Sequence, residues 1–101
     1  MILYNVTSKV DWSIHEEWVQ WMLKEHFPEM LETGCFTNAR LFRLLETDEQ
    51  DGPTYAAQYF AGNKGDYDRY IKEHAPAVRK KYSNKWGDRV ASFRTLMQVI
   101  D

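Results

Sequence analysis

Residues 36–62 read FTNARLFRLLETDEQDGPTYAAQYFAG, and this stretch decides the fold because it holds two strand patterns and the turn between them. Residues 36–46 and 54–62 are rich in the aromatic and aliphatic side chains that strands favour. The acidic segment 47–53 contains Asp51-Gly52, a dipeptide typical of hairpin turns. We therefore predict a β-hairpin in the middle of the chain.

A helix pattern precedes this hairpin. Apolar side chains recur at helical spacing after Ser13, and Ser13 and Glu16 have the spacing of a capping box. We expect Pro28 to end this helix near His26, because the residue before a proline avoids the helical conformation. A short turn over residues 28–32 is expected to follow.

A second helix pattern follows the hairpin, from residue 67 to residue 82, and Pro76 is expected to kink or restart it. Residues 83–87 are predicted to form a loop. The two ends of the chain, 1–10 and 88–100, have the apolar content of strands. The predicted order is β-α-β-β-α-β over a single domain of residues 1–101, which is the α+β ferredoxin-like arrangement of a four-stranded antiparallel sheet with two helices on one face.

The predicted strands carry apolar side chains on both faces, although two helices cover only one. The final strand has one apolar set and a second of opposite parity: Ala91, Phe93, Met97 and Val99 on one side, Val90, Leu96 and Ile100 on the other. An antiparallel sheet with one wet face alternates more cleanly than this. We therefore expect a second copy of the chain to cover the open face, which makes a homodimer.

Composition excludes several classes of function. The chain has 101 residues and a net charge of −2, which argues against general binding of nucleic acid or an acidic membrane. No apolar run approaches the roughly 20 residues of a membrane helix, and the N-terminus lacks the pattern of a secretory signal. The single cysteine, Cys35, fits a cytoplasmic location.

Six segments of the chain resemble an uncharacterised family of short bacterial proteins: Asn5–Thr7, Glu17–Met22, His26–Phe36, Thr54–Tyr59, His74–Pro76 and Phe93–Leu96. The resemblance covers nearly the whole chain. It implies a dimeric α+β barrel, a superfamily of cofactor-free monooxygenases, isomerases, haem-degrading enzymes and ligand binders. The family has no established catalytic residue, so the resemblance does not choose between a small-molecule binder or cofactor-free enzyme and a non-enzymatic dimerisation or scaffold domain.

The histidines are the first candidates for chemistry. No histidine or cysteine spacing typical of a metal site occurs, so we expect no metal and no cofactor. His26 and His74 lie on otherwise apolar helix faces, where a histidine is either hydrogen-bonded in the core or part of a ligand site. Haem-degrading relatives use an Asn, a Trp and a His, and this chain offers Asn5 and His74 without a matching Trp.

RNA-recognition domains share the predicted element order and stack bases on aromatic side chains of two strands. Tyr4, Tyr55 and Tyr59 lie on the corresponding strands. However, the sequence pattern of those domains is absent and the net charge is negative, so we expect no nucleic-acid partner.

Three polar residues interrupt apolar strands: Asn5, Gln58 and Arg94. The strands that carry them are neighbours in a ferredoxin-like sheet. Sorting each strand by parity, we predict that all three point to the face opposite the helices. They form either an internal hydrogen-bond network or an anion-recognising pocket, and with His26 and His74 they are the candidate ligand-binding residues.

Overall fold

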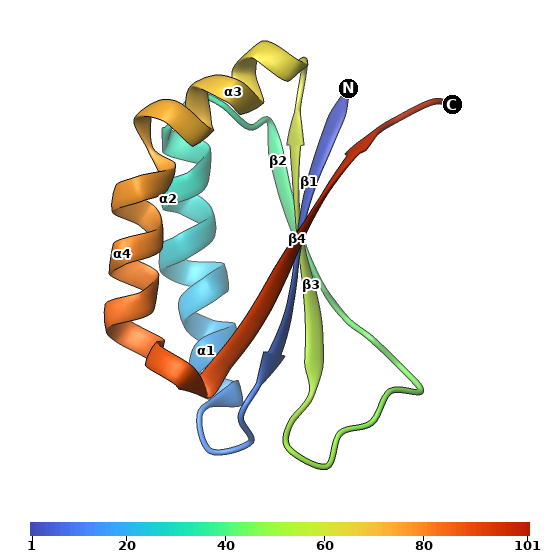
Figure 1. Ribbon diagram of the computed structural model, residues 1–101, viewed down its shortest axis with the longest axis vertical. Coiled ribbons are helices and arrows are strands. Elements are labelled where there is room, and N and C mark those ends of the chain that lie inside the picture. The colour runs from blue at the N-terminus through green and yellow to red at the C-terminus, as the bar shows by residue number, and fades with distance from the viewer.

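The computed structural model describes residues 1–101 and places a layer of helices against one face of an antiparallel sheet (Figure 1). The strands are β1 (Ile2–Val10), β2 (Asn38–Arg43), β3 (Thr54–Ala61) and β4 (Val90–Gln98). The helical segments are α1 (His15–Trp21), the π-helical η1 (Met22–His26), α2 (Phe27–Glu32), α3 (Lys64–Glu73), α4 (Ala75–Trp86) and the 3₁₀ turn η2 (Gly87–Arg89). The sheet order is β2-β3-β1-β4, so the predicted ferredoxin-like topology is confirmed.

Alternate side chains of the strands point towards the helices and form the core between the sheet and the helix layer. The register pairs Tyr4 of β1 with Tyr59 of β3, and both side chains point towards the helices and are almost completely buried. Tyr4 also lies within aromatic contact distance of Phe36, Tyr67 and Tyr70, with ring centroids 5.3–6.2 Å apart. Aromatic side chains therefore hold the helix layer onto the centre of the sheet.

The first helical segment of the chain, α1 to α2, differs from the prediction at both ends. Ser13 does not cap the helix, because its backbone N–H and its hydroxyl both donate to Asp11 Oδ1. Pro28 does not end the helix either, and the chain stays helical to Glu32. The turn before it is π-helical, and Pro28 occupies an early position of α2, where its missing N–H is tolerated.

The second helical segment of the chain, α3 and α4, breaks where predicted but ends later than predicted. The helix breaks at His74 and restarts as α4 with Pro76 near its first position, as expected. The predicted loop over residues 83–87 is wrong, since α4 continues to Trp86. Gly87, with φ of 60°, then ends it in a conformation that favours glycine.

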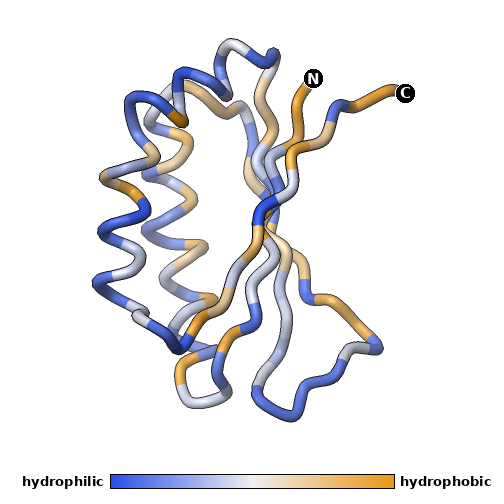
Figure 2. Tube along the Cα trace, in the orientation of Figure 1, coloured by the Kyte–Doolittle hydropathy of each residue, from blue (hydrophilic) through white to orange (hydrophobic).

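The sheet face opposite the helices is open. Phe42, Phe93 and Met97 project from it and are 42%, 63% and 39% exposed, respectively. Figure 2 shows further hydrophobic segments at the C-terminal end and in the loop between β2 and β3, away from the helices. No helix is long and apolar enough to span a membrane.

Candidate ligand-binding site

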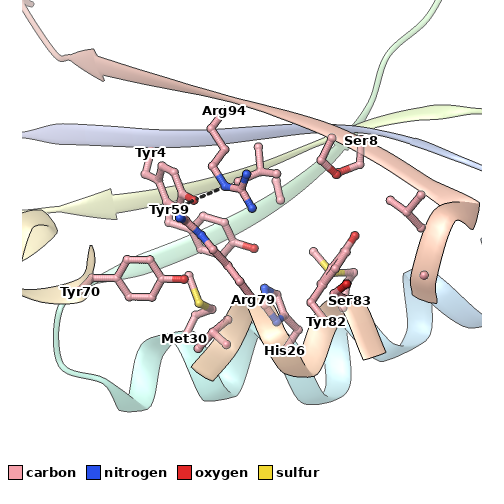
Figure 3. A pocket seen from close by; sticks show the side chains of 17 residues that line it. Tyr4, Ser8, His26, Met30, Tyr59, Tyr70, Arg79, Tyr82, Ser83 and Arg94 are labelled. Carbon is pink, nitrogen blue, oxygen red and sulfur yellow. Dashed lines mark hydrogen bonds between the residues drawn. The ribbon is translucent and has the colours of Figure 1, made fainter. Parts of the chain in front are cut away.

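A cavity of about 280 Å³ lies between the sheet and the helix layer (Figure 3). The sheet side is lined from β1, β3 and β4, and the helix side from η1, α2, α3 and α4. Its apolar lining includes Met22, Met30, Ala57 and Val78. A cavity this large exceeds the roughly 150 Å³ that holds benzene, so it has room for a small organic molecule.

Three buried polar side chains line this cavity without a hydrogen-bond partner in the chain. Tyr59, Tyr70 and His26 are only 1%, 2% and 7% exposed, respectively. The one side-chain polar atom that is fully enclosed and lacks a partner is Trp86 Nε1. The polar atoms of Tyr59, Tyr70 and His26 are therefore not fully enclosed, and they are reached from the cavity that they line. Because unpaired buried polar groups are costly, they are expected to bond to something that occupies the cavity.

Burial also sets the charge of these groups. It lowers the pKa of His26 from 6.5 to about 4, so the imidazole is neutral near pH 7. The ring stacks on Trp21, with centroids 5.0 Å apart. Burial raises the pKa of Tyr59 well above its usual value and raises that of Tyr70 as well. At neutral pH these three side chains are therefore uncharged.

Hydrogen bonds fix the wall next to η2. Trp18 Nε1 donates to Tyr82 Oη at 2.7 Å, and the hydroxyls of Ser8 and Ser92 lie 2.7 Å apart. Burial raises the pKa of Tyr82, although its hydrogen bond with Trp18 acts in the opposite direction. These bonds join α1 to α4 and β1 to β4 at one end of the cavity.

Two arginines stand at the exposed side of the cavity. Arg94 Nε of β4 donates to Tyr4 Oη at 3.0 Å, and Arg79 Nη2 of α4 donates to the same oxygen at 3.3 Å. Both arginines are exposed residues, whereas Tyr4 is buried. Figure 3 shows the two guanidiniums approaching the tyrosine hydroxyl from the sheet and from the helix.

The prediction that Asn5, Gln58 and Arg94 share one face is wrong. Asn5 lies opposite Gln58 on the open face, and Gln58 Nε2 donates to Asn5 Oδ1 at 3.3 Å. Arg94 lies opposite Val6 and points to the helix side, while Phe93 takes the open face where Arg94 was expected. An arginine is tolerated there because β4 is an edge strand that the helices leave exposed.

The two candidate histidines are separated in the fold. His26 lines the cavity, whereas His74 lies at the junction of α3 and α4, outside it, with its ring stacked on Tyr70. Asn5 lies on the opposite face of the sheet from the helices, so it does not meet His74 in a haem-type site. No three His, Cys, Asp or Glu side chains come together as a metal site would require.

The aromatic arrangement of an RNA-binding sheet is not present either. Tyr4, Tyr55 and Tyr59 all face the helices and are at most 7% exposed, so they offer no open platform on which bases stack.

Sequence reasoning missed several lining residues. Tyr70, Arg79 and Tyr82 line the cavity, and none of them is among the candidate residues that the sequence suggested. The helical period could have found two of them, because Arg79 and Tyr82 are three residues apart and therefore share one side of the helix. Together with Val78 they form the side of α4 that lines the cavity.

This combination defines the class of protein: a ferredoxin-like α+β domain with a cavity under its helices. The chain belongs to the family described as a domain of unknown function, DUF4286, whose model matches residues 1–100. No curated protein matches the chain.

Solved structures share the fold at low sequence identity. A "putative antibiotic biosynthesis monooxygenase" from Deinococcus radiodurans is 8% identical with a TM-score of 0.73, covering 100% of this chain and 94% of its own. An ethyl tert-butyl ether d (ethd) family protein from Bacillus halodurans is 9% identical with a TM-score of 0.65, covering 99% and 100%. A dimeric ferredoxin-like protein of unknown function from Jannaschia sp. CCS1 is 14% identical with a TM-score of 0.55, covering 98% and 100%. These similarities show the fold alone.

Proposed function

We propose that this protein is a homodimeric small-molecule-binding protein of the cytoplasm, with one ligand cavity in each subunit. The observation that carries the proposal is the 280 Å³ cavity lined by the buried side chains of Tyr59, Tyr70 and His26, whose polar atoms are reached from the cavity and make no hydrogen bond within the chain. A dimerisation or scaffold domain has no need of such groups, and its cavity would be filled by side chains.

Binding fits these groups better than proton transfer does. A general acid or base works best with a pKa near the operating pH. The pKa of His26 is lowered to about 4, and burial raises those of Tyr59, Tyr70 and Tyr82. At neutral pH these side chains donate and accept hydrogen bonds without gaining or losing a proton.

The experiment is native mass spectrometry of the purified protein, followed by identification of any bound mass. We expect a small molecule bound to each chain, lost in Val78→Phe, which fills the cavity from α4, and retained in the control Ala77→Phe on the exposed side of the same helix. A chain that carries no molecule, and whose Val78→Phe variant is more stable than the wild type, supports the scaffold domain.

The dimer is supported by the open sheet face. Phe93, Phe42 and Met97 form an exposed apolar surface there, and one solved structure of similar fold is described as dimeric. We expect the wild type to sediment at twice the 12.0 kDa chain mass, and Phe93→Glu to sediment as a monomer. The control is Leu23→Glu, which places the same charge at an exposed leucine of the helix layer and leaves the dimer intact. A wild-type monomer at micromolar concentration contradicts the dimer.

A further inference from the structure

Two positive charges meet at one point of the cavity wall. Arg79 comes from α4 and Arg94 from β4, and each donates one hydrogen bond to Tyr4 Oη, at 3.3 and 3.0 Å. A guanidinium has five N–H donors and keeps its charge at any physiological pH. Most donors of both arginines therefore remain free beside the cavity.

Neither guanidinium has an anionic partner. The four ion pairs of the chain involve Arg43, Lys64, Arg69 and Lys81, and no carboxylate lies within 4 Å of Arg79 or Arg94. Burial acts to lower the pKa of Arg79, but the surrounding tyrosines, first of all Tyr4 through its hydrogen bond, outweigh it and raise that pKa. Two like charges held on one neutral oxygen repel each other, and an anion placed between them would relieve that repulsion.

The rest of the cavity has a different character. Its apolar lining comes from Met22, Met30, Ala57 and Val78, and burial keeps His26 uncharged near pH 7. A ligand that fits both regions has one anionic group and a compact, mostly apolar body. With about 280 Å³ available, against roughly 150 Å³ for a cavity that holds benzene, that body is limited to one or two rings.

We infer that the cavity binds a small organic acid, whose carboxylate lies between Arg79 and Arg94 and whose apolar body lies beneath the helices. This inference rests on the proposed function and specifies its ligand class. The planar fork of a guanidinium matches the two oxygens of a carboxylate, so a neutral ligand of the same shape is a poor substitute. Tyr4, through its two hydrogen bonds, is the positioning residue that holds both forks at the cavity.

The test compares acids with their amides by isothermal titration at low salt. The probes are 2-naphthoate with 2-naphthamide and benzoate with benzamide, because each pair shares its shape and differs in charge. We expect the acid of each pair to bind at least about tenfold more tightly than its amide. Arg79→Gln and Arg94→Gln are each expected to bring that ratio towards one, because each weakens the binding of the acid more than that of the amide.

Two further variants separate charge recognition from a general disturbance. Lys80→Gln removes a positive charge from the neighbouring position of α4, outside this cavity, and is expected to keep the preference for the acid. Arg94→Lys keeps the charge without the fork and is expected to retain part of the preference.

Three outcomes overturn the inference. Equal binding of acids and amides shows that the site does not recognise the negative charge. The protein would then still be a small-molecule binder, but not one specific for organic acids. A preference for acids that persists in both Arg→Gln variants shows that groups other than Arg79 and Arg94 bind the carboxylate. Failure of every acid to bind removes the ligand class, whereas the proposed function is judged separately by the mass that the purified protein carries.

Discussion

Acid is expected to destabilise the fold through His26. The pKa of this side chain is about 4 in the folded chain because burial disfavours the imidazolium, against 6.5 when it is exposed. Between these values the unfolded chain binds more protons than the folded chain, so stability falls as the pH falls. The contribution of His26 is fully present above pH 6.5 and is lost progressively as the pH decreases towards 4.

The magnitude follows from the two pKa values. At 1.36 kcal/mol for each factor of ten in proton affinity, the interval from 6.5 to about 4 corresponds to about 3 kcal/mol of unfolding free energy. That is a large part of the roughly 5–15 kcal/mol that holds a domain of this size together.

The assay is urea unfolding followed by tryptophan fluorescence at half-unit steps from pH 7.5 to 4. Between pH 7 and 4 the wild type is expected to lose about 3 kcal/mol more than His26→Gln, which has no imidazole to protonate. His15→Gln, which replaces a histidine outside the cavity, is expected to show the full wild-type loss. If wild type and His26→Gln lose stability in parallel, the reasoning about His26 is refuted.

The remaining predictions concern single contacts, each measured as the unfolding free energy in urea. Tyr82→Phe leaves the buried Trp18 N–H without its 2.7 Å acceptor and is expected to cost about 1–3 kcal/mol, and a neutral result would show that another acceptor replaces it. Gly52→Ala places a Cβ against the Val10 carbonyl oxygen, well inside van der Waals contact, and is expected to cost at least about 2 kcal/mol, so an unchanged variant would contradict the close approach of this loop. Lys81→Met removes an exposed ion pair with α2 and is expected to leave the unfolding free energy unchanged within the error of the measurement, because exposed ion pairs are weak; a clear loss of stability would contradict its surface character.

Local sequence patterns were sufficient to predict the topology. The hairpin over residues 36–62, two helix patterns and two terminal strands allow few arrangements, and the helix restart near Pro76 was predicted for the correct reason. The helix end at Pro28 was predicted wrongly, because a proline after a π-helical turn occupies a place where no N–H is needed. A sequence pattern does not reveal that turn.

The candidate site was predicted only in part. His26 and Arg94 line the cavity, whereas Asn5 and Gln58 bond to each other on the opposite face of the sheet. The polarity of a residue marks it as unusual for a strand, but the face it occupies depends on the register with the neighbouring strand. One residue of difference in that register moves every side chain of a strand to the other face.

Arg94 lies on the helix side of the sheet, and not on the predicted open face, for the same physical reason that the cavity lies where it does. The sheet has four strands, and the helix layer leaves its edge strand β4 exposed along almost its whole length. Apolar side chains at the helix-facing positions of such a strand would meet water, and this chain places Ser92 and Arg94 at two of them. The same incomplete cover leaves space beneath α4, next to the aromatic centre around Tyr4. Polar residues at alternate positions of an otherwise apolar edge strand therefore indicate where a helix layer stops covering its sheet and where a ligand can enter.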